Sequence, residues 1–232
     1  MAIGQQAVDR VPSLTAPAAL VEVRTVREGS NGGHQHLHTA IGDRLQYQGH
    51  EASERGGVAH LKIRLHDTGS ALDALVALSS KVGSASFTAT TTVTNGSAEP
   101  TTLLTVSALM LELVTESKGD YADYRLHWAR NDWTKECRWQ HDSIVDLLVP
   151  DLGDFEYSID SRRPFGVAGV GTWSSGHFLP MGMLENLASG FAVAWQIENP
   201  GPWRWEVGDR SRSLVIGTYG PLDLEHHWNR TL

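Results

Sequence analysis

Cysteine is almost absent from this chain of 232 residues, since Cys137 is the only one. A single cysteine cannot form an internal disulfide or supply a cysteine-based zinc site, and its scarcity is typical of a reducing compartment. The sequence also lacks any run of eighteen or more apolar residues, and its first residues have neither the positive start nor the apolar core of a secretory signal. We therefore expect a soluble, cytoplasmic protein without a membrane partner.

Basic residues are outnumbered. Nineteen Lys and Arg face 27 Asp and Glu, which gives a formal net charge of -8. Such a charge repels phosphate backbones and anionic lipid surfaces, so nucleic acid is not expected as a partner. The length suits one large domain, and 41% hydrophobic residues are enough to build a core.

Aromatic residues are scarce in the first half, where only Tyr47 and Phe87 precede Tyr121. All eight tryptophans lie between Trp128 and Trp228. Large flat side chains are common in recognition surfaces as well as in cores. We therefore expect the chemistry, or at least the recognition, to reside in the second half.

Helical periodicity is rare, and the dominant period is two. Leu61, Ile63 and Leu65 alternate with polar residues, which predicts a half-buried antiparallel strand. Similar signals occur at residues 21–26, 44–48, 85–94, 101–109, 191–197, 203–207 and 214–218. Glycine-rich turns such as Gly56-Gly57 separate them. The pattern predicts an all-β fold, a large antiparallel sandwich with few short helices.

Three local signals refine this prediction. Asn95-Gly96 tolerates the positive φ angles of a tight turn and predicts a hairpin between its flanking strands. Gly208-Asp209 predicts a second turn. Residues 142–149 carry apolar residues at helical spacing and predict a short helix that ends at Pro150.

The histidines offer candidate ligands. His34, His36 and His38 alternate, so on a strand all three project from one face, as a metal site could require. No carboxylate or cysteine lies near them, and a solvated strand face is the more common meaning of such a pattern. We assign no metal and no cofactor, and a metal-dependent enzyme stays a minor alternative.

No catalytic residue is assigned either. The sequence has no Gly-x-Ser-x-Gly elbow before a helix and no Walker lysine. Glu185, Glu206, Asp209 and Glu225 lie in the tryptophan-rich half, but their spacing does not show that any two face one another across a sugar ring.

A colinear series of tryptophan-containing motifs runs through the second half. In order, these are Leu126-His127-Trp128-Ala129-Arg130-Asn131-Asp132-Trp133, Arg138-Trp139-Gln140, Gly171-Thr172-Trp173-Ser174, Trp195-Gln196-Ile197-Glu198, Trp203-Arg204-Trp205-Glu206 and Glu225-His226-His227-Trp228. The series closely resembles the N-terminal domain of glycoside hydrolase family 36 α-galactosidases from about Tyr124 to Trp228. The first half is similar in outline only.

This resemblance implies a large antiparallel β-supersandwich over residues 21–232, with residues 1–20 as a leader or loose segment. In that family the domain precedes a (β/α)₈ barrel, which hydrolyses terminal α-galactosides with retention through two aspartates. The Lys-Trp-Asp nucleophile motif of the barrel has no counterpart here. The resemblance thus implies a non-catalytic domain that supports barrel packing and a homo-oligomer, with a free-standing carbohydrate-binding β-sandwich as the alternative.

The resemblance also implies site candidates in the motifs. Contact with the barrel, or secondarily with an α-galactoside sugar, is expected at Asn131, Trp133, Trp139, Trp173 and His226. Members of the family often carry His-Asn-Ser-Trp near the first motif, whereas this chain adds the charges of Arg130 and Asp132.

Overall fold

Antiparallel strands make up nearly all of the computed structural model, which describes residues 18–29, 36–113, 121–147, 149, 164–170, 173–210, 213–222 and 230–232. These residues form fourteen strands and one short helix, α2 (Ala40–Arg44). The all-β prediction is confirmed. The described helix has five residues, far fewer than the roughly 20 that cross a bilayer.

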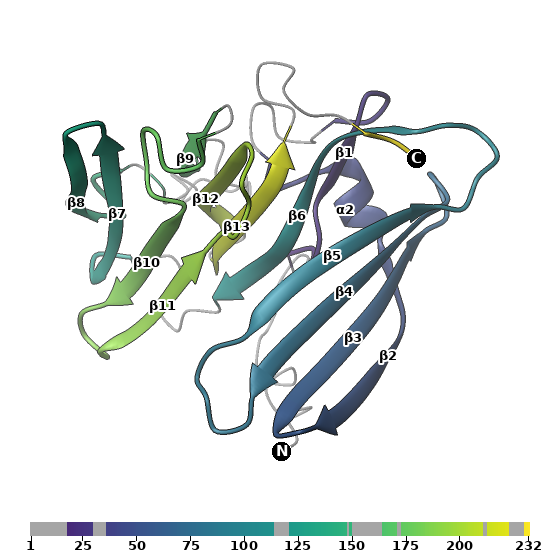
Figure 1. The fold of residues 1–232 in the computed structure, drawn as a ribbon, viewed down its shortest axis with the longest axis horizontal. Coiled ribbons are helices and arrows are strands. Elements are labelled where there is room, and N and C mark those ends of the chain that lie inside the picture. Colours follow the sequence, from purple (N-terminus) through teal and green to yellow (C-terminus); the bar gives the residue numbers. More distant parts are fainter. Residues whose placement is uncertain are drawn as a thin grey trace, which may run out of the picture.

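The strands form three sheets, here called the central, meander and hairpin sheets (Figure 1). The central sheet has the order β1 (Val23–Thr25), β6 (Thr102–Leu113), β13 (Ser213–Leu222), β12 (Trp203–Arg210), β9 (Phe165–Gly169), with β14 (Arg230–Thr231) also paired to β6. The meander sheet runs β2 (Gln46–Arg55), β3 (Val58–Asp67), β4 (Leu72–Lys81), β5 (Thr88–Asn95). The hairpin sheet has the order β11 (Phe191–Gln196), β10 (Met181–Asn186), β7 (Tyr124–Asp132), β8 (Lys135–Ser143).

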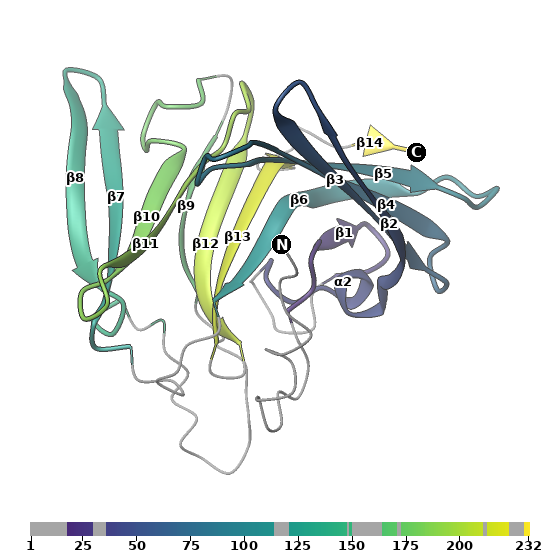
Figure 2. The same ribbon diagram turned by 90° about the horizontal axis from the view of Figure 1, so that it is seen from below.

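Two apolar cores join these sheets. One lies between the hairpin sheet and the central sheet, and it includes Leu126 and Trp195 of the former with Trp205 and Ile216 of the latter. The other joins the meander sheet to β1, β6 and α2. Leu111 of β6 packs against both cores, so the central sheet is continuous between its two partners (Figure 2). This arrangement is a β-supersandwich.

The period-two pattern was a reliable guide to the meander sheet. Leu65 of β3 is buried against the core, while Lys62 and Arg64 of the same strand are exposed. Gly56 and Gly57 link β2 to β3 with φ of 60° and 74°, values that glycine adopts without steric cost. The turn and the strand are both as predicted.

The Asn95-Gly96 hairpin prediction is wrong. Asn95 ends β5 and pairs with Leu72 of β4, whereas the next strand, β6, belongs to another sheet. The Asn95 amide donates to the Glu99 carbonyl at 2.8 Å, and its Oδ1 accepts the Ser97 N–H at 3.0 Å. The asparagine therefore turns the chain through its side chain, as this residue often does, and begins a crossover instead of a tight turn.

Two further local predictions are wrong. The described residues of the segment 142–149 form no helix: Asp142 and Ser143 belong to β8, and Ile144, directly after them, is buried in the core where a single turn begins. Core burial of Ile144 outweighs a weak helical preference. Gly208-Asp209 lies within β12, because pairing with β13 continues to Arg210. The sequence pattern did not predict strands β4, β7, β8, β10 and β14.

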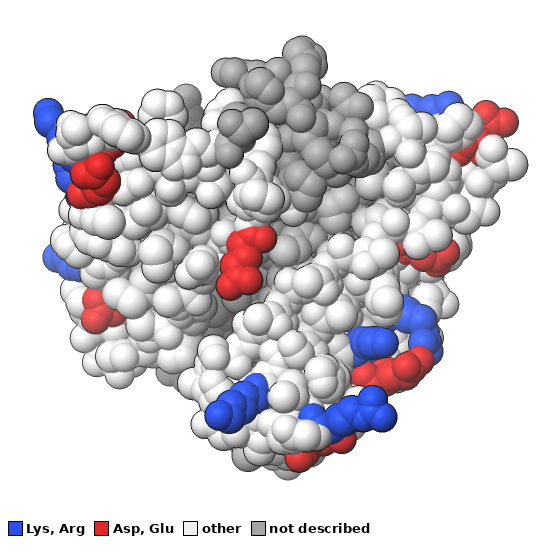
Figure 3. Space-filling model, in the orientation of Figure 1, with Lys and Arg blue, Asp and Glu red and all other residues white. Residues whose placement is uncertain are grey.

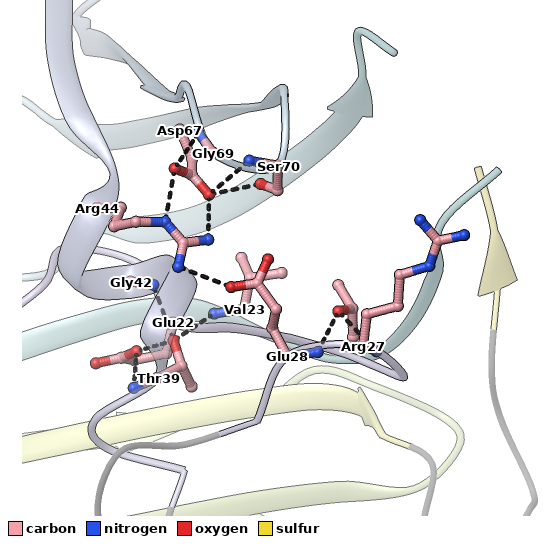
Figure 4. A network of polar contacts seen from close by, with 11 residues as sticks. Glu22, Val23, Arg27, Glu28, Thr39, Gly42, Arg44, Asp67, Gly69 and Ser70 are labelled. Atoms are coloured by element: carbon pink, nitrogen blue, oxygen red, sulfur yellow. Dashed lines mark hydrogen bonds and ion pairs between the residues drawn. The ribbon is translucent and has the colours of Figure 1, made fainter. Parts of the chain in front are cut away.

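Helix α2 is fixed by polar contacts at both ends (Figure 4). Thr39 caps it by accepting the Gly42 N–H at 2.9 Å. At the other end, Arg44 donates to both carboxylate oxygens of Asp67, at 3.0 and 2.7 Å, and forms an ion pair with Glu28 at 2.7 Å. The helix is therefore tied to β3 and to the loop after β1.

Candidate functional site

The seven described tryptophans divide into buried and exposed sets. Four of them, Trp128, Trp195, Trp203 and Trp205, are buried in the core between the hairpin and central sheets. Three remain exposed: Trp133 (73%), Trp173 (53%) and Trp139 (41%). The tryptophan-rich half therefore contributes both buried indoles to the core and exposed indoles to the surface.

Trp133 occupies the turn between β7 and β8. Asp132 pairs with Lys135, so Trp133 and Thr134 form a two-residue connection. Thr134 has φ of 63°, a left-handed conformation that is unfavourable for a β-branched residue. The turn projects the indole into solvent, since strand pairing ends just before it.

Asn131 holds this turn to the loop that contains Trp173. Its amide donates to the Ser175 carbonyl at 2.6 Å, its Oδ1 accepts the Cys137 N–H at 3.0 Å, and its own N–H donates to the His177 carbonyl at 2.8 Å. The side chain is 9% exposed. Asn131 is thus a positioning residue, because both ends of its amide are engaged within the chain.

Trp133 and Trp173 meet edge to face, with ring centroids 5.6 Å apart and planes at 72°. We call the surface formed by Asn131, Trp133 and Trp173 the tryptophan tip. Its loop is anchored to the core, since the buried Trp203 donates its indole N–H to the Ser174 carbonyl at 2.5 Å. The tip therefore offers two exposed indoles on a base that hydrogen bonds anchor to the core.

The charges near the tip are compensated within the chain. Asp132 forms an ion pair with Arg138 and lies 3.7 Å from Nδ1 of His177. The Arg130 guanidinium lies 5.9 Å from the Trp128 ring centroid, within the range of a cation–π contact. Both charged residues of the first motif therefore have partners within the chain: Asp132 pairs with Arg138, and Arg130 lies near the ring of Trp128. His177 and Ser175 were missed from sequence, because their backbone carbonyls make the key contacts and any residue could supply those.

Of the predicted site residues, the structure brings Asn131, Trp133 and Trp173 together. Trp139 lies apart, on β8 opposite Ala129, and within the described part of the chain no ring contact joins it to the other two. His226 lies outside the described residues.

The three-histidine pattern does not become a shared strand face. His34 lies outside the described residues, and His36 and His38 lie in a bend. His36 donates its N–H to Glu206 at 2.9 Å and packs its ring 5.4 Å from that of Tyr219, while His38 contacts Asp43 at 2.7 Å. Burial, with the nearby charges of Arg204 and Arg24, lowers the pKa of His36 to about 3. Among the described residues, no three His, Cys, Asp or Glu side chains are arranged to hold a metal ion.

A buried polar network lies beside this bend. Glu206 is fully buried and accepts from Arg204 at 2.9 Å and from the Tyr219 hydroxyl at 3.3 Å. Burial raises the pKa of Glu206 despite these partners. The network ties the N-terminal segment to the central sheet, so Glu206 has a structural place and does not face Glu185 in the hairpin sheet.

Comparison with known proteins identifies the fold. No family model and no curated protein matches the chain. Solved structures do: an α-galactosidase of glycoside hydrolase family 36 from Geobacillus stearothermophilus (AgaA) is 14% identical over 94% of this chain, with a TM-score of 0.62. The α-galactosidase from Lactobacillus brevis is 14% identical over the whole chain (TM-score 0.61), and the galactosidase domain of an α-galactosidase-sucrose kinase is 12% identical over 92% of it (0.64).

The matched share of those enzymes is small. The chain spans 28% of the two α-galactosidases and 27% of the galactosidase domain. At this identity the likeness shows the fold. The 232 residues thus have the fold of one β-sandwich portion of these enzymes.

Proposed function

We propose that this chain is the non-catalytic N-terminal domain of a retaining α-galactosidase, which supports the packing and oligomerisation of a catalytic (β/α)₈ barrel. One observation carries the proposal: nearly the whole chain matches solved α-galactosidases, yet it spans little more than a quarter of each. A domain that matches only about a quarter of an enzyme is expected to support the catalytic part that makes up the rest.

The tryptophan tip is the surface we assign to the barrel or to a neighbouring subunit. Trp133 and Trp173 are more than half exposed, and large exposed indoles are enriched where one protein contacts another. On the face seen in Figure 3, much of the surface is uncharged, although an acidic group lies near its middle. Exposed indoles favour a protein partner, with an α-galactoside sugar as a secondary ligand.

The proposal includes a cytoplasmic location and a homo-oligomeric parent enzyme. The location is supported by the single, exposed and unpaired Cys137, which suits a reducing compartment. The oligomer is supported by the exposed indoles, which a second subunit could cover.

Turnover of an aryl α-galactoside tests the proposal. We expect none from these 232 residues and clear turnover from the longer polypeptide that an uninterrupted reading frame would encode. Activity of the 232 residues alone, or a reading frame without a barrel, would overturn it.

Self-association of the 232-residue chain tests the role of the tip. An unpaired interface should associate at high concentration in light scattering, and Trp133→Ser with Trp173→Ser should abolish this. Trp139→Ser is the matched control, because Trp139 is exposed but lies outside the tip. Calorimetric titration with galactose and raffinose completes the test: binding by the chain alone would support a carbohydrate-binding module instead.

A further inference from the structure

Two histidines and a carboxylate lie side by side on the outer face of the hairpin sheet. His141 of β8 is directly opposite His127 of β7, and their Nδ1 atoms are 2.6 Å apart. On the other side, Nε2 of His127 lies 3.0 Å from Oε2 of Glu185 on β10. The face is the outer one, because strand neighbours alternate and Leu126 and Leu184 point into the core.

The carboxylate determines how His127 can act. An ionised carboxylate only accepts hydrogen bonds, so Nε2–H of His127 donates to Glu185, and the neutral ring of His127 carries its lone pair on Nδ1, directed at His141. Metal-binding histidines have this arrangement, in which a carboxylate accepts the other N–H of the ring and fixes its orientation. His127 is also held in place, since its side chain is only 13% exposed.

We infer that His127 and His141 form a two-histidine chelate for a late transition-metal ion, with Cu²⁺ the tightest-bound divalent ion. The metal replaces the proton shared by the two Nδ1 atoms, and that proton passes to solvent. Metal–nitrogen bonds of about 2 Å place two adjacent ligand atoms about 3 Å apart, so a small rotation of the exposed His141 ring is sufficient. Imidazole ligands suit copper, and affinities rise from Ni²⁺ to Cu²⁺ and fall again at Zn²⁺.

The strand order leaves the metal-binding nitrogen of His127 to His141. Met183 is opposite His127 on β10, on the same side of β7 as Glu185, whereas His141 lies on β8. Water would complete the coordination, since His141 is exposed. None of the three side chains of this site belongs to the tryptophan tip, and the inference does not depend on the proposed function.

Titration of the untagged chain with Cu²⁺, followed by electron paramagnetic resonance, tests the site. We expect one ion whose spectrum shows coupling to two imidazole nitrogens. His141→Asn should remove that signal and weaken the tightest binding at least tenfold. His66→Asn is the matched control, because His66 contacts Asp73 at 2.8 Å in the same histidine–carboxylate way but has no histidine opposite it on β4.

Glu185→Gln separates a metal site from a simple hydrogen-bonded pair. It keeps both ligands but weakens the acceptor that orients His127, so we expect copper affinity to fall about tenfold or more. Equal stoichiometry and affinity in the parent chain and His141→Asn would overturn the inference, since the ion would then occupy other histidines. Unchanged affinity in Glu185→Gln would overturn the role of Glu185.

Discussion

Glu22 makes the fold sensitive to pH in a direction opposite to that of most carboxylates. Its side chain is buried, Oε2 accepts the Thr39 N–H at 2.8 Å, and among the described residues Oε1 has no partner. Burial raises the pKa of Glu22 to about 7, although hydrogen bonds from Thr39 and the charge of Arg210 oppose this. Gly42 permits the approach, since a Cβ there would lie 2.2 Å from Oε2.

The sign and size of the effect follow from proton linkage. A folded-state pKa above the unfolded value of 4.5 means that the folded state binds the proton more tightly. The resulting stability is complete below pH 4.5 and is lost as pH rises through about 7. Each pKa unit corresponds to about 1.4 kcal/mol, so the loss at alkaline pH is about 3 kcal/mol. Glu22→Gln removes the charge and should therefore stabilise the protein above neutrality.

Thermal unfolding at about pH 5 and about pH 8 measures this. A chain of this size shifts its melting temperature by roughly 2–4 °C per kcal/mol, so we expect Glu22→Gln to melt about 6–12 °C above the parent at the higher pH and close to it at the lower. Glu51→Gln is the control, because Glu51 is exposed and paired with Arg64. If Glu22→Gln melts below the parent at the higher pH, the carboxylate is ionised and well solvated there, and the reasoning fails.

Two further changes test other parts of the fold. Asp67→Asn should destabilise by about 1–2 kcal/mol in urea unfolding at neutral pH. Burial alone raises the pKa of Asp67, but hydrogen bonds from Arg44, Ser70 and Gly69 lower it to about 2. The ionised carboxylate therefore stabilises the fold above pH 3.8, and the stability deficit of Asp67→Asn should vanish near pH 2. A deficit that persists near pH 2 would refute the ionic origin. Thr134→Gly should raise the free energy of unfolding by about 0.5–1 kcal/mol, because a left-handed φ strains threonine but not glycine. The control Thr90→Gly, at an exposed strand position, should lower it by a similar amount. Equal losses of stability in both variants would refute strain at Thr134.

Sequence periodicity predicted some of the strands that have one solvent-exposed face and missed others, such as β7, in which buried and exposed residues also alternate. β3 is among those predicted, and its alternation was enough to locate it. β4 was missed because its side chains are at least half covered along most of its length, so its apolar run Leu75-Val76-Ala77-Leu78 shows no alternation. The Asn95-Gly96 error has another cause: the local signal of a turn does not show which sheet the next strand will join.

The candidate site was predicted in part for similar reasons. Exposed indoles at Trp133 and Trp173 follow from their positions in turns, where strand pairing ends. That the two rings would meet does not follow, because it depends on Asn131 bonding to the carbonyl of Ser175, a contact between segments 44 residues apart. Long-range backbone contacts leave no composition signal, so only the fold reveals them.

The buried tryptophans anchor the exposed tip to the core. Trp203 and Trp205 are two residues apart on β12 and therefore face the same core. Gly169 lets the Trp203 ring approach closely, since a Cβ there would lie 2.3 Å from its indole nitrogen. That nitrogen in turn holds the Ser174 carbonyl, one residue from Trp173. The same residue type thus serves two purposes: an indole in the core fixes the loop, and the fixed loop would let its exposed indoles meet the proposed partner at little cost in conformational entropy.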